Sequence, residues 1–420
     1  MTIDPDLVRQ ARLKAGLSLA QVAGSDLSRQ AVHLIETGKV RPSMRSLQII
    51  ARRLGVSALT FQMPVDAGAE VPHRRAAELE RLCERQSFDE VVDLAGHLLA
   101  QDTTTYLEAF AHLYLGRALT HLGRPDEALP HARQARQLFD GEDDPWSAAE
   151  AREWEAGALF LKQDARAVAV CEDALERYRA LEPRRSEVEA RMVEHLATIL
   201  VQRSDYIRAE RFYQEALQVA GPVLDLARLG RIYHGLGQCS FCLGDVRRAI
   251  ELVSRAVALY AVENDLRPAP ARIDLPRVEN DLGMMLLRNG QPARAEELFQ
   301  SALRRLEEVG AERLQSYVLL SLAEARQGQD QLDEAVGLIE KAIDLAQRLG
   351  ERRAVASAHR QLGELHELRH EHHLADECFR EALATLDEAG MSTARTELMA
   401  VYQRLLDARA DAAPLERSAG

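Results

Sequence analysis

The sequence has few of the features that mark membrane, secreted or catalytic proteins. It contains no run of about eighteen apolar residues, so we expect no membrane-spanning helix. Asp4 and Asp6 interrupt the N-terminal stretch, which is therefore unlike a signal peptide. Its five cysteines, an odd number scattered over 420 residues, indicate reduced thiols and a cytoplasmic location. Because no Walker loop, dinucleotide glycine fingerprint or Gly-x-Ser-x-Gly elbow occurs, we expect no enzyme and no cofactor.

Charge is distributed unevenly along the chain. Residues 1–65 contain nine Lys and Arg against four Asp and Glu, which gives this segment a net charge of +5. The whole chain carries −13, so the remaining 355 residues carry −18. A basic segment attached to an acidic body is what localised binding to nucleic-acid phosphates predicts.

The basic segment has the pattern of a small helical bundle. Apolar spacing predicts helices over 7–12, 19–23 and 29–37, and a fourth that opens at 42–43. Ser18 and Ser28 precede the second and third helices, where a serine hydroxyl caps a helix well. Gly16 and Gly38 follow the first and third helices, as helix-ending glycines do.

The stretch from Ser28 to Lys39, followed by Arg41-Pro42-Ser43, resembles the phage-repressor-like (XRE/Cro-type) helix-turn-helix family. This resemblance implies binding to double-stranded DNA, with the third helix in the major groove. It also implies a buried ion pair between Arg12 and Glu36. The expected base readers are Arg29, Gln30 and His33, next to Ser28, and the expected phosphate contacts are Lys39, Arg41, Ser43 and Arg45. The expected core residues are Val22, Ala23, Val32, Ile35 and Leu47.

A linker is expected over 64–73, which contains Pro64, Gly68 and Pro72. Beyond it an alanine recurs, with a second alanine seven residues later and a Gly or Ala twelve residues earlier. Small residues at such points allow two helices to pack closely. The recurring first alanines are Ala128, Ala209, Ala249, Ala295, Ala335 and Ala375, and a degenerate copy contains Ala167 and Ala174.

This pattern resembles the tetratricopeptide repeat, although the copies are about 40 residues long. The resemblance implies an all-α protein in which the helix-turn-helix bundle is followed by a right-handed superhelix of helical hairpins. We expect about eight repeats over 74–390, a capping helix over 391–410 and a disordered tail over 411–420.

The first helix of each hairpin lines the concave groove of such a superhelix. Arg191, Arg231 and Arg277 occupy the same position in three successive copies, and Asn280 is one of only three Asn in the chain. Arg suits a carboxylate, and Asn can bond to a peptide amide. The predicted ligand-binding residues are therefore Arg191, Glu194, Arg231, His234, Gln238, Arg277 and Asn280. The alternative is that these arginines pair with neighbouring glutamates on solvated helices.

The domain order resembles that of the bacterial peptide-pheromone receptors of the Rgg, PlcR and PrgX kind. The resemblance implies a homodimeric transcription regulator whose groove binds a peptide or a small ligand, which changes how the dimer holds DNA. The alternative is an interaction scaffold whose repeats bind a protein partner and bring it to DNA.

Two further motifs have structural explanations. His366-Glu367-Leu368-Arg369-His370 spells the His-Glu-x-x-His pattern of zinc proteases, but it falls at the end of a repeat helix and its turn. We therefore expect no metal site there. Cys239 and Cys242 form a Cys-x-x-Cys within a repeat helix, where packing is a better explanation than redox chemistry.

Overall fold

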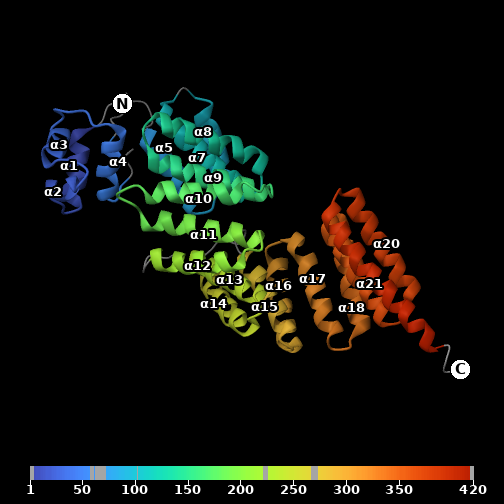
Figure 1. The fold of residues 1–420 in the computed structure, drawn as a ribbon. Coiled ribbons are helices and arrows are strands. Elements are labelled where there is room, and N and C mark those ends of the chain that lie inside the picture. The colour runs from blue at the N-terminus through green and yellow to red at the C-terminus, as the bar shows by residue number, and fades with distance from the viewer. Residues whose placement is uncertain are drawn as a thin grey trace. The chain divides into compact units, whose positions relative to one another are not determined.

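The computed structural model describes residues 4–56, 61, 72–101, 103–220, 226–265 and 273–416. These residues form 21 helices and no strand, which confirms the all-α prediction (Figure 1). The chain divides into two compact units, Met1–Asp225 and Leu226–Gly420. No helix in the described ranges is long and apolar enough to cross a membrane.

The N-terminal head consists of four short helices, α1 (Pro5–Lys14), α2 (Leu19–Ala23), α3 (Arg29–Glu36) and α4 (Met44–Arg53). Serine hydroxyls cap three of them, because the side chains of Ser18, Ser28 and Ser43 accept hydrogen bonds from the backbone N–H three residues later. All five predicted core side chains are buried in the head. Phe61, which lies beyond α4, completes this core.

Two arginines fix the head internally. The Arg12 guanidinium donates to both carboxylate oxygens of Glu36, at 2.6 and 2.9 Å, which confirms the predicted ion pair between α1 and α3. Arg53 of α4 donates to the Val22 carbonyl at 2.9 Å and forms an ion pair with Asp26. Since these contacts lie at the α2–α3 turn, Arg53 holds the turn that precedes the recognition helix.

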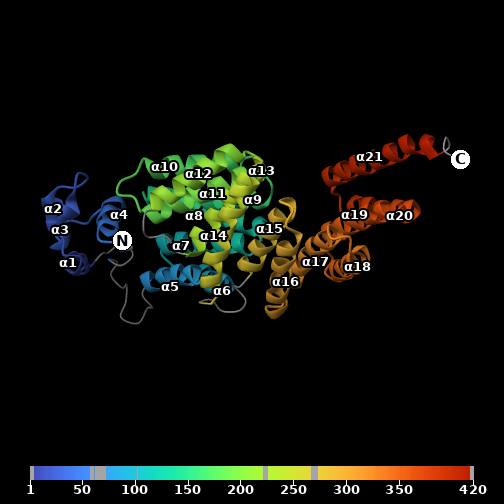
Figure 2. The ribbon, with the colours of Figure 1, turned by 90° about the horizontal axis from the view of Figure 1, so that it is seen from below.

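Eight helices follow the head within the first unit and pack as sequential hairpins (Figures 1 and 2). Their bounds are α5 Pro72–Glu84, α6 Phe88–Leu99, α7 Thr105–His121, α8 Pro125–Gly141, α9 Pro145–Leu161, α10 Ala167–Arg179, α11 Ser186–Gln202 and α12 Tyr206–Ala220. The degenerate copy is present as α9 and α10, with Ala167 and Ala174 buried.

The second unit continues the pattern with four hairpins and one final helix. Its bounds are α13 Leu226–Cys242, α14 Val246–Asn264, α15 Asp274–Arg288, α16 Pro292–Glu308, α17 Glu312–Gln327, α18 Leu332–Arg348, α19 Arg352–Leu368, α20 His372–Glu388 and α21 Ser392–Glu416. The last helix continues to Glu416, six residues beyond the end of the predicted capping helix, 391–410. Residues 417–420 and most of the predicted linker, 64–71, lie outside the described residues.

The small residues that revealed the repeat lie where the two helices of a hairpin touch. Ala249 and Ala256 of α14 are fully buried against α13. A Cβ added at Gly363 of α19 would lie 3.0 Å from the Phe379 ring of α20, so no larger residue fits without a shift. The spacing of the small residues therefore marks where the two helices of a hairpin touch. It also gives the first helices of all hairpins a common register.

Candidate DNA-binding and ligand-binding sites

The predicted base-reading residues lie together on α3. Arg29, Gln30 and His33 are all exposed, whereas Val32 and Ile35 on the same helix are buried. The Ser28 hydroxyl accepts a hydrogen bond from the Ala31 N–H at 2.9 Å, so this residue also caps the helix. An exposed polar side on a helix anchored by its apolar side is the geometry that major-groove reading requires.

The predicted phosphate contacts continue from α3 into α4. Lys39, Arg41, Ser43 and Arg45 are exposed. Within the described residues, none of the cations Arg29, Lys39, Arg41 and Arg45 forms an ion pair. Such unpaired, exposed charges can neutralise phosphates without first breaking an internal contact. Ser43 has an additional role, because its hydroxyl accepts from the Ser46 N–H at 3.1 Å and so caps α4.

The opposite side of α4 contacts the repeats through a buried polar group that the sequence analysis missed. Gln48 donates through Nε2 to the Tyr106 hydroxyl of α7 and, at 2.8 Å, to the Asp144 carboxylate. The Tyr106 hydroxyl donates to the same carboxylate oxygen at 2.9 Å. We call Gln48, Tyr106 and Asp144 the head–repeat cluster. All three are at most 5% exposed, and burial raises the pKa of the Asp144 carboxyl.

A second contact lies beside the head–repeat cluster. The Arg52 guanidinium of α4 lies over the Trp146 ring, 5.0 Å from its centre. Trp146 is itself held, because its indole N–H donates to the Pro183 carbonyl at 3.0 Å. One signal in the sequence could have revealed this interface. Gln48 falls within the apolar stripe of α4, where a polar residue requires a buried partner.

In the first unit, the predicted groove residue Arg191 is engaged in internal ion pairs. Arg191 of α11 donates to Glu153 of α9 at 2.7 Å and to Glu150 of α9 at 3.0 Å. His195 contacts the same Glu153 carboxylate at 2.7 Å. Glu153 is buried, yet its pKa is lowered to about 2, because the attraction of Arg191 and His195 outweighs desolvation. Arg191 therefore pairs with glutamates, as in the alternative interpretation, but in a mostly buried place rather than on a solvated helix.

Glu194, the other predicted groove residue of the first unit, is 3% exposed on α11. The Trp154 ring lies between two arginines, with the guanidinium carbons of Arg117 and Arg191 at 5.3 and 5.8 Å from its centre. This part of the face is packed and charged. Its polar groups already contact one another, so few of them remain to bind a ligand.

The corresponding positions of the second unit are more open. His234 of α13 bonds to Asp281 of α15 at 2.8 Å, and Gln238 lies 3.3 Å from the same imidazole nitrogen. Arg231 is half-buried on α13. Arg277 is half-exposed and, among the described residues, pairs with Asp274, 3.4 Å away on its own helix. The structure thus brings His234, Gln238 and Asp281 together, and leaves Arg277 largely in solvent.

Asn280 of α15 has an unsatisfied polar atom, as its neighbour Glu279 does. Its amide oxygen is buried and has no hydrogen-bond partner among the described residues. Leaving a buried acceptor unsatisfied costs about 1–3 kcal/mol, so native proteins rarely do it without a reason. By its place in the repeat Asn280 belongs to the groove-facing set, where a bound ligand could supply the missing donor.

The His-Glu-x-x-His motif has a structural role. The Glu367 carboxylate accepts hydrogen bonds from Arg409 of α21 at 2.9 and 3.0 Å, and His372 lies 3.2 Å from it. Arg409 also reaches Asp376 at 2.8 Å, so it joins α21 to α19 and α20. Across the described ranges no three His, Cys, Asp or Glu side chains are grouped so as to hold a metal ion.

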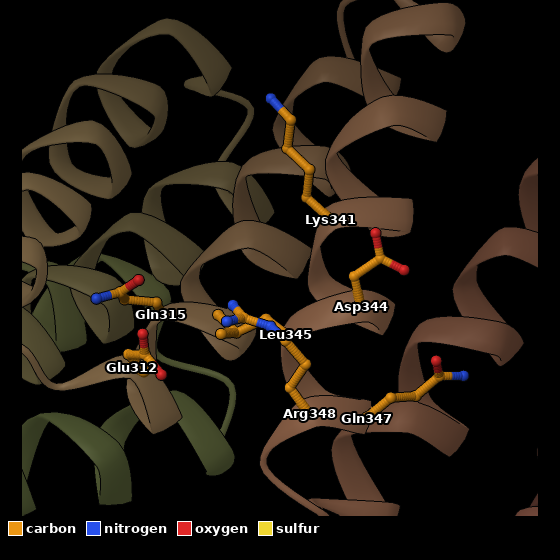
Figure 3. A pocket seen from close by; sticks show the side chains of 7 residues that line it. All are labelled: Glu312, Gln315, Lys341, Asp344, Leu345, Gln347 and Arg348. Atoms are coloured by element: carbon orange, nitrogen blue, oxygen red, sulfur yellow. The ribbon is translucent and has the colours of Figure 1, made fainter.

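An open pocket of about 570 Å³ lies between α17 and α18 (Figure 3). Its lining combines carboxylates, amides and cations, and none of these residues was predicted from the sequence. They are Glu312, Gln315, Lys341, Asp344, Leu345, Gln347 and Arg348. Because charges of both signs line an open hollow, the pocket does not favour one class of ligand.

Comparison with known families agrees with the two-part architecture. Residues 8–61 match the helix-turn-helix family. Residues 188–261, 280–309 and 312–388 match tetratricopeptide-repeat families. No curated protein matches the sequence. These matches confirm a helix-turn-helix DNA-binding head followed by tetratricopeptide repeats.

Several solved structures share the fold. The apo form of the quorum sensor NprR from B. thuringiensis is 12% identical, with a TM-score of 0.62 over 91% of this chain and 100% of that chain. The apo form of RapI is 14% identical, with a TM-score of 0.53 over 68% and 99%. A Rap protein complexed with competence and sporulation factor is 15% identical, with a TM-score of 0.50 over 88% and 99%. At these identities the likeness shows the fold alone.

Proposed function

We propose that this helix-turn-helix and tetratricopeptide-repeat chain is a cytoplasmic transcription regulator, in which ligand binding to the repeats alters the DNA binding of a homodimer. Its domains are those of a DNA-binding regulator rather than of an enzyme. One observation supports DNA binding above all others. Exposed base-reading side chains on α3 adjoin a row of exposed cations without ion pairs in the described residues.

The ligand that we propose is a peptide or a small molecule with peptide-like hydrogen-bonding groups. The buried oxygen of Asn280 supports this, because it needs a donor such as a backbone N–H. Arg277 is the cation of the predicted set that is most available to a carboxylate. The fold likeness to a protein described as a quorum sensor is consistent with the same class of ligand.

The DNA half of this proposal is tested by selecting fragments of host DNA with the purified protein at physiological salt. We expect a few sharp palindromic sites. Arg29→Ala should relax the base preference at one position by about 1–3 kcal/mol, whereas Arg45→Ala should weaken all sites alike and reduce the salt dependence. If Arg29→Ala lowers the affinity for every DNA sequence equally, this residue does not read a base.

The ligand half is tested by repeating the selection with the peptide fraction of the host's spent medium. A change in site occupancy that Asn280→Ala abolishes would support a peptide receptor. If the repeats instead retain a protein from the host and the peptide fraction has no effect, the chain acts as a scaffold that brings this partner to DNA.

A further inference from the structure

The contact between α4 and the repeats is polar, although an apolar contact would be enough to hold the head against the repeats. A head held only by apolar packing could settle in several orientations at similar free energy, since apolar contacts are not directional. The head–repeat cluster is satisfied in one arrangement only, because the Asp144 oxygen must accept from Gln48 and Tyr106 at once. A buried polar contact of this kind specifies orientation rather than adding stability.

The same Asp144 side chain also fixes the repeats. Its second oxygen accepts from the Ser147 N–H at 3.2 Å, which caps the first turn of α9. The orientation of the head is therefore tied to the N-terminus of α9, and through Tyr106 to that of α7. Arg52 and Trp146 extend the contact along α4.

The docked orientation is compatible with DNA binding. The head–repeat cluster uses Gln48 of α4, while Arg29, Gln30 and His33 of α3 stay exposed. The contact thus leaves the recognition helix free and determines where it points. In a dimer, the direction of each head sets the separation of the two recognition helices, which must match the spacing of two half-sites.

We propose that Gln48, Tyr106 and Asp144 are positioning residues that hold the DNA-binding head in one orientation on the first repeats. This inference rests on the proposed function, because it assigns the head–repeat cluster to the selection of paired half-sites. Loss of the cluster frees the head, so binding to two half-sites loses its preorganisation while binding to one half-site is kept.

The decisive variant is Gln48→Glu. It leaves Asp144 and its cap of α9 in place, so the repeats should fold. A second carboxylate then faces the buried Asp144 carboxylate, neither of them can donate a hydrogen bond when ionised, and the head–repeat cluster fails. Adding Asp144→Asn reverses the polarity of the whole group and keeps one oxygen for the α9 cap. The carboxylate now lies on α4, Asn at 144 donates to it, and the Tyr106 hydroxyl donates to the carboxylate and accepts from the amide.

Head orientation is measured by electron–electron distance spectroscopy, with spin labels at Lys14→Cys on α1 and Gln137→Cys on α8. Both native residues are exposed, and the exposed native Cys242 is replaced by Ser. We expect a narrow distance distribution with the native cluster, a broad one in Gln48→Glu, and a narrow one again after Asp144→Asn is added. Tyr106→Phe should broaden it less, since it removes one hydroxyl.

DNA binding is measured on the selected palindrome and on its single half-site. Gln48→Glu should weaken palindrome binding about tenfold or more and leave half-site binding unchanged, and adding Asp144→Asn should restore palindrome binding. Asp376→Asn is the matched control, because Asp376 also accepts from a tyrosine hydroxyl, Tyr402 at 2.9 Å, but in the second unit. It should change neither the distance distribution nor the binding to DNA.

A distribution that stays narrow in Gln48→Glu, or equal losses on palindrome and half-site, would overturn the positioning role. If the native protein selects no DNA sequence, the proposed function fails. The spin-label distances would then still decide whether the head–repeat cluster fixes the head.

Discussion

The first helices of the hairpins present different chemistry in the two units. In the first unit, Arg191 of α11 is held between Glu150 and Glu153 and is almost fully buried. In the second, Arg277 of α15 occupies the same place in its repeat but is half-exposed, and nearby Asn280 keeps a buried oxygen without a partner in the described residues. An arginine at a groove position is thus not a ligand site in itself. The residues on the first helix of the preceding hairpin decide whether it is already bound.

The largest expected effect comes from Arg191→Ala. Removing this guanidinium leaves Glu153 buried without its main partner, so we expect the free energy of unfolding to fall by about 3–5 kcal/mol. The matched change Arg277→Ala breaks only a solvated pair and should shift stability by about 0.5 kcal/mol or less. Urea unfolding followed by circular dichroism checks both. Equal effects of the two changes would contradict the comparison.

How far the sequence could predict these features depends on how local they are. The serine caps at Ser18 and Ser28 and the spacing of the repeat alanines depend on residues close in the chain, and all were predicted. The partners of Arg191 lie 38 and 41 residues earlier, on a neighbouring hairpin. Asp144 lies 96 residues beyond Gln48. Pairing across such separations depends on the packing of whole helices, which periodicity alone does not give.

The first unit is also expected to be sensitive to acid. His112 of α7 and His131 of α8 share a close contact, with their Nδ1 atoms 2.8 Å apart, and Glu108 and Glu127 are the charged groups nearest to them. Burial and the facing imidazole lower the pKa of His112 to about 4, and burial lowers that of His131. Between pH 6.5 and 4 the unfolded chain therefore binds more protons than the folded one, so stability falls as the pH falls through this window.

We expect this histidine pair to account for about 1–2 kcal/mol of lost stability at pH 5 relative to pH 7.5, after allowance for its partial exposure. His112→Gln should remove most of that difference. Thermal unfolding at the two pH values measures it. The control is His373→Gln in the second unit, where the imidazole is exposed, and this change should leave the pH dependence as it is. An unchanged pH dependence in His112→Gln would show that the pair does not titrate in this window.

Asn280→Ala should have the smallest effect on stability and the clearest effect on ligand response. The buried oxygen of Asn280 has no described partner to lose, so its removal should change the free energy of unfolding by less than about 1 kcal/mol. The peptide-dependent change in DNA binding should nevertheless disappear, because a bound peptide loses its acceptor. Asn289→Ala, at the end of the same helix and exposed, is the control. A normal response in Asn280→Ala, or a large loss of stability, would mean that this oxygen is satisfied within the fold and that the second unit resembles the first.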